Sequence, residues 1–185
     1  ALGIQISPFV GVREMPRPSG VVRDPDLVAR YRNLEPGYSW PYSLSSTPRV
    51  PENLRMMVDM WNATSDNDVA GVLVIDSVAL AELVATAGAG EVGVGTSAIS
   101  TDQLLDWLLV GQYEQYGDDI AARQAAYGEV AAAAMDALSA NPADPTTFAE
   151  MLRSLIAGRH LQAYAVDPGV QAQLSRASMT GELVD

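Results

Sequence analysis

The sequence predicts an α/β fold, a single domain in which several helices cover one mixed sheet. Three observations lead to this prediction. The 185 residues match the size of one domain, and 48% of them are hydrophobic, enough for a substantial core. Short runs rich in β-branched residues alternate with segments whose apolar residues recur at helical spacing. Such alternation is typical of helices layered on a sheet.

The first third of the chain is predicted to hold two helices and a long irregular segment. Residues 1–12 alternate loosely and indicate one or two short strands. Asp24 followed by Pro25 is typical of a helix start, and this helix is expected to end near Tyr31. Residues 33–51 are rich in Pro, Ser, Tyr and Gly and are expected to be irregular. The apolar face of the next helix is formed by Leu54, Met57, Val58 and Trp61.

The middle of the chain is predicted to alternate strand and helix. Val69–Ile75 is a continuous apolar run, as expected of a buried strand. Asp76 then caps a helix, and Glu91–Val94 forms the next strand. Ser100 and Gln103 stand at capping-box spacing before a further helix. The residues expected to face inward from these two helices are Leu80, Leu83, Val84, Ala87, Leu104, Leu105, Leu108 and Leu109.

The last third is predicted to hold three helices and one strand. A long helix is expected over about residues 119–139. Asp144–Pro145 and Asp167–Pro168 repeat the pattern of a capping residue followed by proline, and Leu161–Val166 between them indicates a strand. The residues of the long helix expected to face inward are Ile120, Tyr127, Ala131, Ala134 and Leu138.

Charge and residue usage exclude several kinds of function. The chain has 11 positive residues against 23 acids, and a net charge of −12 repels nucleic acid. All the positive residues are arginines, and without lysine there is neither a Walker phosphate loop nor a Schiff-base enzyme. The absence of cysteine excludes disulfides and thiolate chemistry. We expect no cofactor and no resident metal.

Positive charge is concentrated in the first third of the chain. Residues 1–60 hold seven arginines and six acids, whereas residues 61–185 hold four arginines and 17 acids. A site for an anionic ligand would therefore draw on this part, where Arg30 and Arg32 are candidates. The alternative is that these arginines are solvated surface residues.

The irregular segment carries two aromatic candidates, Trp40 and Tyr42. Exposed aromatic side chains suit contacts with carbohydrate or with a protein partner.

Residues 88–93 match the pattern G-x-G-x-x-G. In a nucleotide-binding fold these glycines follow a strand and open a helix, so that the phosphate lies at the helix N-terminus. Here the glycines follow a helix and precede a strand, which indicates a connection and no nucleotide site.

Three further residues are candidates for binding or catalysis. Asp76 directly follows a strand, where ligands gather in open α/β sheets, although a helix cap requires the same residue. Arg123 lies at the edge of an apolar helix face and can bind carboxylate or phosphate, unless it pairs with Asp118 or Asp119. His160, the only histidine, is expected to interact with the C-terminus of the preceding helix.

Three stretches carry a family resemblance: residues 70–76 with 79–83, Gln112-Tyr113 leading to Arg123, and residues 158–161 running on to Gln171 and Gly181. With them the chain resembles an actinobacterial envelope family, the domain of unknown function 4012. The resemblance implies an extracytoplasmic domain of the cell envelope, whose longer parent has an N-terminal membrane anchor. It implies no established activity.

The chain is more remotely similar to the LytR-CpsA-Psr phosphotransferases. Val74-Ile75-Asp76 resembles their strand–aspartate–helix segment, and Arg123-Gln124 resembles the start of their long helix, where arginines bind lipid pyrophosphate. Ile120 stands where that motif has its preceding arginine, which disfavours catalysis because phosphoryl transfer depends on electrostatic stabilisation.

Two functions follow from these patterns. The preferred one is an extracytoplasmic domain that binds a protein partner or a cell-envelope glycopolymer without catalysis. The alternative is a LytR-CpsA-Psr-like phosphotransferase that acts on polyprenyl-diphosphate-linked glycopolymers, using Arg123, Asp76 and the N-terminal arginines around Mg²⁺.

Overall fold

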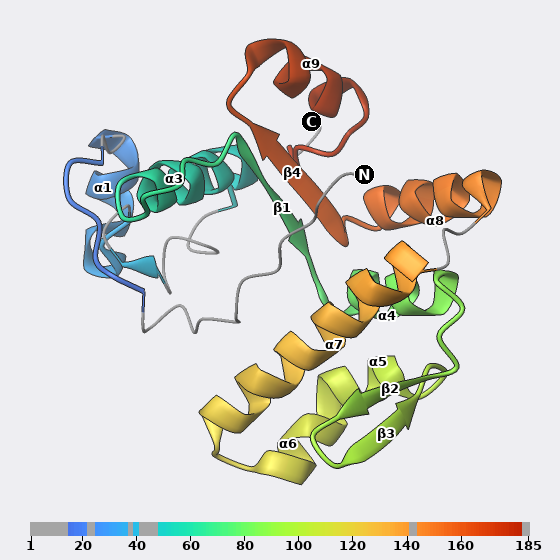
Figure 1. Cartoon of the computed structure of the whole chain (residues 1–185). Coiled ribbons are helices and arrows are strands. Elements are labelled where there is room, and N and C mark those ends of the chain that lie inside the picture. The colour runs from blue at the N-terminus through green and yellow to red at the C-terminus, as the bar shows by residue number, and fades with distance from the viewer. Residues whose placement is uncertain (1–14, 22–24, 37–38, 41–47, 141–143, 183–185) are drawn as a thin grey trace. The chain divides into compact units, whose positions relative to one another are not determined.

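The computed structural model describes residues 15–21, 25–36, 39–40, 48–140 and 144–182 (Figure 1). Its contacts divide the chain into two units. Among the described residues, those from 75 to 160 form unit 1, and those before 75 or after 160 form unit 2. The strands expected over residues 1–12 lie outside the described residues. That the whole chain acts as one domain stays a prediction.

Unit 2 is built around one pair of strands. Strand β1 (Gly71–Ile75) and strand β4 (Leu161–Ala165) form a two-stranded sheet, although they are far apart in sequence. The pairing is antiparallel, because the N–H of Val166 donates to the carbonyl of Ala70 at 2.8 Å and the N–H of Asp76 donates to the carbonyl of His160 at 3.2 Å. The helices of unit 2 are α1 (Pro25–Tyr31), the 3₁₀ turn η1 (Arg32–Leu34), α3 (Val50–Asn62) and α9 (Pro168–Arg176).

Unit 1 combines a hairpin with helices. Strands β2 (Glu91–Val94) and β3 (Ser97–Ser100) pair antiparallel, with Val92 opposite Ile99. The hairpin packs on α7, and α7 packs on α4, so that Val92, Val94, Val84 and Val130 lie in one core. The helical elements of unit 1 are α4 (Ser77–Thr86), α5 (Leu104–Asp106), the π-helical turn η2 (Trp107–Gly111), α6 (Gln112–Tyr116), α7 (Ile120–Ala140) and α8 (Pro145–Ala157).

The α/β class is confirmed, but the sheet differs from the expected one. In the described part of the chain, the strands form two separate two-stranded sheets and no single mixed sheet. Strand β3 was not expected. No helix within the described ranges combines the length and the apolar character needed to cross a bilayer.

Two residues expected to face inward are exposed. Leu109 is 52% exposed because it lies in the π-helical turn, whose wider backbone changes the angle between successive side chains. Ile120 is 47% exposed and stands at the first position of α7. The centre of the same helix behaves as expected, since Ala134 is buried.

Candidate functional site

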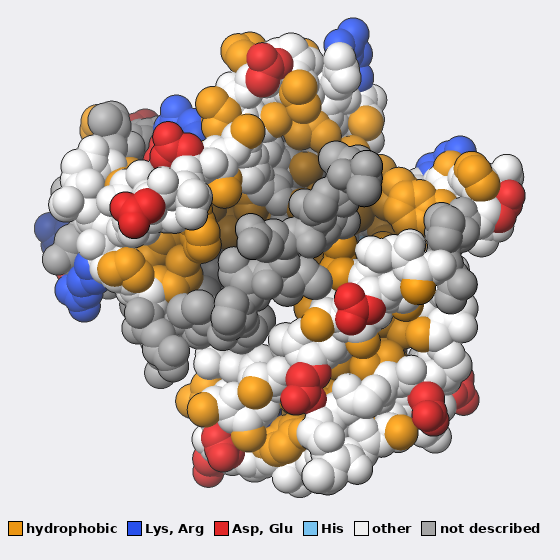
Figure 2. Space-filling view, viewed as in Figure 1, with side chains coloured by type: hydrophobic (Ala, Val, Ile, Leu, Met, Phe, Trp, Pro, Cys, Tyr) orange, Lys and Arg blue, Asp and Glu red, His pale blue; other side chains and the backbone are white. Residues whose placement is uncertain are grey.

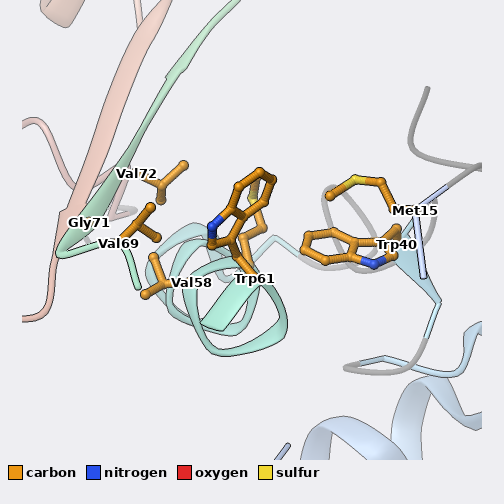
Figure 3. Close-up of a pocket in the computed structure, with 8 residues that line it drawn as sticks. Met15, Trp40, Val58, Trp61, Val69, Gly71 and Val72 are labelled. Atoms are coloured by element: carbon orange, nitrogen blue, oxygen red, sulfur yellow. The ribbon is translucent and has the colours of Figure 1, made fainter. Parts of the chain in front are cut away.

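An apolar pocket of about 320 Å³ lies in unit 2 beside α3 (Figure 3). In this view Trp61 stands between the valines that precede and begin β1 and the ring of Trp40. The volume is at the lower end of the roughly 300–1,000 Å³ that is usual for small-molecule sites. It suits a small apolar group or the end of a hydrocarbon chain. The described residues that line it are all apolar: Met15, Trp40, Met57, Val58, Trp61, Val69, Gly71 and Val72.

Both tryptophans of this pocket use their indole N–H groups within the protein. Trp40 donates to the carbonyl of Pro16 at 2.9 Å, and Trp61 donates to the carbonyl of Asn67 at 3.1 Å. Trp40 is only 4% exposed, so the expectation of an exposed aromatic there is wrong. The two rings therefore offer the pocket apolar surface. Tyr42, the other aromatic candidate, lies outside the described residues.

The arginine candidates of the first third are both exposed and belong to unit 2. Arg30, on α1, lines a small hollow of about 70 Å³. The carboxylate of Asp26 lines the same hollow, so that its charge is mixed. Arg32 lies in the 3₁₀ turn and does not line it. Neither arginine belongs to the unit that holds Arg123.

Asp76 caps α4, as predicted, and it also binds His160. One carboxylate oxygen accepts the N–H of Ala79 at 3.0 Å. The other lies 2.7 Å from Nδ1 of His160. The histidine follows the last turn of α8, where its own N–H donates to the carbonyl of Leu155 at 2.8 Å. The helix-end position of His160 was predicted, whereas its partner was not.

These contacts lower the pKa of the Asp76 carboxyl below its ordinary value of 3.8. Burial is the largest single influence and would raise the pKa. The hydrogen bonds from Ala79 and His160, the positive charge of His160 and a further contact with the N–H of Val78 together outweigh it. The carboxylate form is therefore favoured.

Arg123 is held on an aromatic ring, and no acidic residue in the described part of the chain pairs with it. Its guanidinium carbon lies 4.5 Å from the centre of the Tyr113 ring. Its buried Nε–H has no hydrogen-bond partner within the described part of the chain. Asp119 instead accepts the N–H of Ala122 at 3.0 Å and caps α7. The expected alternative, an ion pair with a neighbouring aspartate, does not form.

A polar network lies between α4, the π-helical turn and α7. The hydroxyl of Tyr127 donates to the carbonyl of Leu108 at 2.8 Å, and it accepts a hydrogen bond from Gln112 at 2.8 Å. The hydroxyl of Ser77 lies 3.2 Å from the same oxygen. Gln112 is 2% exposed and also donates to the carbonyl of Leu108. Such networks fix the helices that they connect.

This network connects the surroundings of two predicted site residues. Ser77 directly follows Asp76, and Tyr127 lies four residues, or about one helical turn, after Arg123 on α7. The contact between Ser77 and Tyr127 therefore brings the two segments together. The other described candidates belong to unit 2: Arg30, Arg32 and Trp40.

Apolar and acidic side chains share the exposed surface of unit 1. Leu109, Val110, Tyr113 and Ile120 are each about half exposed. Where α7 and the hairpin face the viewer in Figure 2, the charged side chains are acidic and hydrophobic side chains lie between them. Within the described ranges, no three acidic or histidine side chains converge closely enough to hold a metal ion.

Gly88 and Gly90 form the expected connection, and Gly93 lies within β2. Gly88 has a φ of 72° and follows α4, where its N–H donates to the carbonyl of Ala85 at 3.0 Å, and β2 begins at Glu91. The first two glycines therefore follow a helix and precede a strand, unlike those of a nucleotide-binding turn.

Comparison with known proteins identifies one family. The family model described as "Protein of unknown function (DUF4012)" matches residues 4–113, which is more than half of the chain. The match includes Asp76 and the Trp40–Trp61 pocket, and it ends before Arg123 and His160. No curated protein and no solved structure matches the chain significantly.

Proposed function

Because the chain belongs to the DUF4012 family, which has no assigned function, we propose a function from the site itself: a non-catalytic domain of the cell envelope that binds the apolar part of a lipid. The envelope location rests on the resemblance of residues 70–83 and 112–123 to an extracytoplasmic family. The ligand class rests on the pocket of unit 2.

The apolar lining of the Trp40–Trp61 pocket carries this proposal. A sugar ring can stack on tryptophan, but its hydroxyls also require hydrogen-bond partners. Here both indole N–H groups are already bonded to main-chain carbonyls, and the described lining residues contribute no charged or amide side chain. A hydrocarbon chain loses no hydrogen bonds on entering such a pocket. An acyl or prenyl chain therefore fits better than a glycan.

Two neighbouring residues of β1 provide a matched test. Val72 lines the pocket, whereas Leu73 is 58% exposed, and successive side chains of a strand point to opposite faces. We expect the prenyl alcohol farnesol to bind the wild-type chain and the Leu73→Gln variant equally in isothermal titration calorimetry. We expect Val72→Gln to weaken binding about tenfold, because it places an amide in an apolar site. Equal affinities for all three chains would count against the pocket.

A second candidate function is favoured by one observation at Arg123. It is a LytR-CpsA-Psr-like phosphotransferase acting on polyprenyl-diphosphate-linked glycopolymers. Among the described residues the guanidinium forms no ion pair, so its positive charge is available to an anionic ligand. The Mg²⁺ of that reaction does not fit the described residues, because Asp76 is engaged by Ala79 and His160 and no cluster of metal ligands surrounds it.

A thermal-shift measurement separates the two functions. The wild-type chain, Arg123→Ala and Arg153→Ala are heated with farnesyl diphosphate and Mg²⁺, and separately with farnesol. Arg153 is an exposed arginine of the same unit and serves as the control. A ligand of the folded state raises Tm by mass action. Stabilisation by the diphosphate that only Arg123→Ala abolishes supports the phosphotransferase-like site. Equal stabilisation by both compounds in all three chains supports the apolar pocket.

A further inference from the structure

The segment 75–160 begins and ends at the same place in the fold. It connects β1 to β4, and these strands are neighbours in one antiparallel sheet. The main-chain bond from the N–H of Asp76 to the carbonyl of His160 joins the second residue of the segment to its last. Asp76 and His160 are thus hydrogen-bonded to each other although they are 84 positions apart in the sequence.

The side chains of Asp76 and His160 join the same two ends. The carboxylate oxygen and Nδ1 are 2.7 Å apart, a typical length for a charge-assisted hydrogen bond. Asp76 is the N-cap of α4, where a negative charge is favourable, and His160 follows the C-terminus of α8, where a positive charge is favourable. α4 and α8 also pack against each other. The carboxylate therefore agrees in sign with the dipole of α4, and a protonated imidazole would agree with that of α8.

Gly158 allows the imidazole to take this position. A Cβ at residue 158 would overlap Cδ2 and Nε2 of the His160 ring, so that the ring lies directly against the backbone at the end of α8. Close packing on one side and the carboxylate of Asp76 on the other leave the ring little freedom. The geometry is fixed by residues from two helices that are distant in sequence.

We propose that Asp76 and His160 form a clasp that holds the two ends of the segment 75–160 together and slows their separation. The clasp is independent of any ligand. Its strength is that of a half-exposed pair, because the side chains are 51% and 34% exposed. It therefore acts on local opening of the segment ends and not on the folding of the whole chain.

A double-mutant cycle on the full chain tests the clasp. The readout is hydrogen exchange at the main-chain amide of Asp76. This amide exchanges only when its hydrogen bond to the carbonyl of His160 is broken. Asp76→Asn keeps a capping side chain but removes the charge. We expect it to speed exchange at this amide roughly two- to fivefold in the wild-type background, and clearly less in the His160→Ala background, where only the favourable charge at the N-terminus of α4 is lost.

Asp144→Asn is the matched control. Asp144 caps α8 by accepting the N–H groups of Thr146 and Thr147, without a histidine in contact. The same change there should leave exchange at Asp76 unaltered. The clasp is overturned if Asp76→Asn has the same effect with and without His160, or if it has no effect at all.

Discussion

The guanidinium of Arg123 rests on the ring of Tyr113 at 4.5 Å, while its buried Nε–H has no hydrogen-bond partner in the described part of the chain. An arginine in the interior of a fold is normally paired, because an unmade hydrogen bond of a buried donor costs about 1–3 kcal/mol. The cation–π contact compensates for part of this cost. This side chain is therefore held in place by packing on Tyr113, and its charge has no acidic partner among the described residues.

Replacing Arg123 by methionine should cost little stability. Arg123→Met keeps an apolar stem over Tyr113 and removes the unpaired donor. We expect its free energy of unfolding in urea to stay within about 1 kcal/mol of the wild-type value, because the lost cation–π contact and the removed desolvation cost are of similar size. A loss above about 2 kcal/mol would reveal an internal hydrogen-bond partner of Arg123 and contradict the finding that its Nε–H is unpaired.

Replacing Gly71 by alanine should destabilise the sheet of unit 2. A Cβ at this position would overlap the carbonyl oxygen of Tyr164 on the paired strand. We expect Gly71→Ala to lower the free energy of unfolding by about 1–3 kcal/mol, the usual cost of overpacking. Gly93→Ala on β2 is the control, since a Cβ there meets no atom within 4 Å. Equal stability of the two variants would contradict the close pairing of β1 with β4.

Removing the hydroxyl of Tyr127 should weaken unit 1. In Tyr127→Phe the buried amide of Gln112 loses an acceptor at 2.8 Å, and Leu108 loses a donor at 2.8 Å. We expect a loss of about 1–3 kcal/mol in urea denaturation, because two hydrogen bonds are lost and Gln112 and Leu108 keep only the one between them. Tyr116→Phe removes an exposed hydrogen bond to Gln115 and should cost much less. Similar losses in both variants would argue against a buried network.

The contribution of Asp76 to stability should depend on pH. Its pKa in the folded chain is lowered, because the N–H of Ala79 and His160 favour the carboxylate against the opposing effect of burial. The contribution is therefore complete above the ordinary value of 3.8 and is lost as the pH falls through the lower folded value. We expect the stability difference between the wild type and Asp76→Asn to shrink as the pH falls below 3.8. A difference that grows as the pH falls below 3.8 would contradict the lowered pKa.

Local signals in the sequence predicted three helix starts correctly, whereas Ser100, expected to open a helix, is the last residue of β3. Asp76, Asp144 and Asp167 each accept a main-chain N–H at the start of a helix, as their positions before α4, α8 and α9 indicated. Capping depends on residues within one turn, so that the sequence contains all the information. The strand from Leu161 was predicted for a similar reason, from a short run bounded by turn residues.

Features that depend on distant packing were not predicted. Trp40 was expected to be exposed because it lies in an irregular segment, but it packs with Met56 and Met60 of α3. Strand β3 was missed because Ser97–Ser100 has little β-branched character, and it forms through its pairing with β2.

The contact between Asp76 and His160 had an indirect signal in the sequence. The aspartate directly follows one predicted strand, and the histidine directly precedes another. Antiparallel pairing of these two strands brings the residues together, but the sequence did not reveal that they pair. The sequence also did not reveal that Arg30 and Arg32 belong to one unit and Arg123 to the other, because this division depends on the fold of the whole chain.

Tryptophan fluorescence in a Trp107→Phe variant tests the proposed lipid-binding function most directly. The chain has three tryptophans, of which Trp40 and Trp61 line the pocket and Trp107 belongs to unit 1. In this variant the emission comes only from the pocket. Dodecanoic acid brominated near the end of its chain should quench it saturably, and Val72→Gln should shift the quenching to about tenfold higher concentration. If the Trp107→Phe variant is folded and brominated dodecanoic acid leaves its emission unchanged, the binding of a hydrocarbon chain between Trp40 and Trp61 is contradicted.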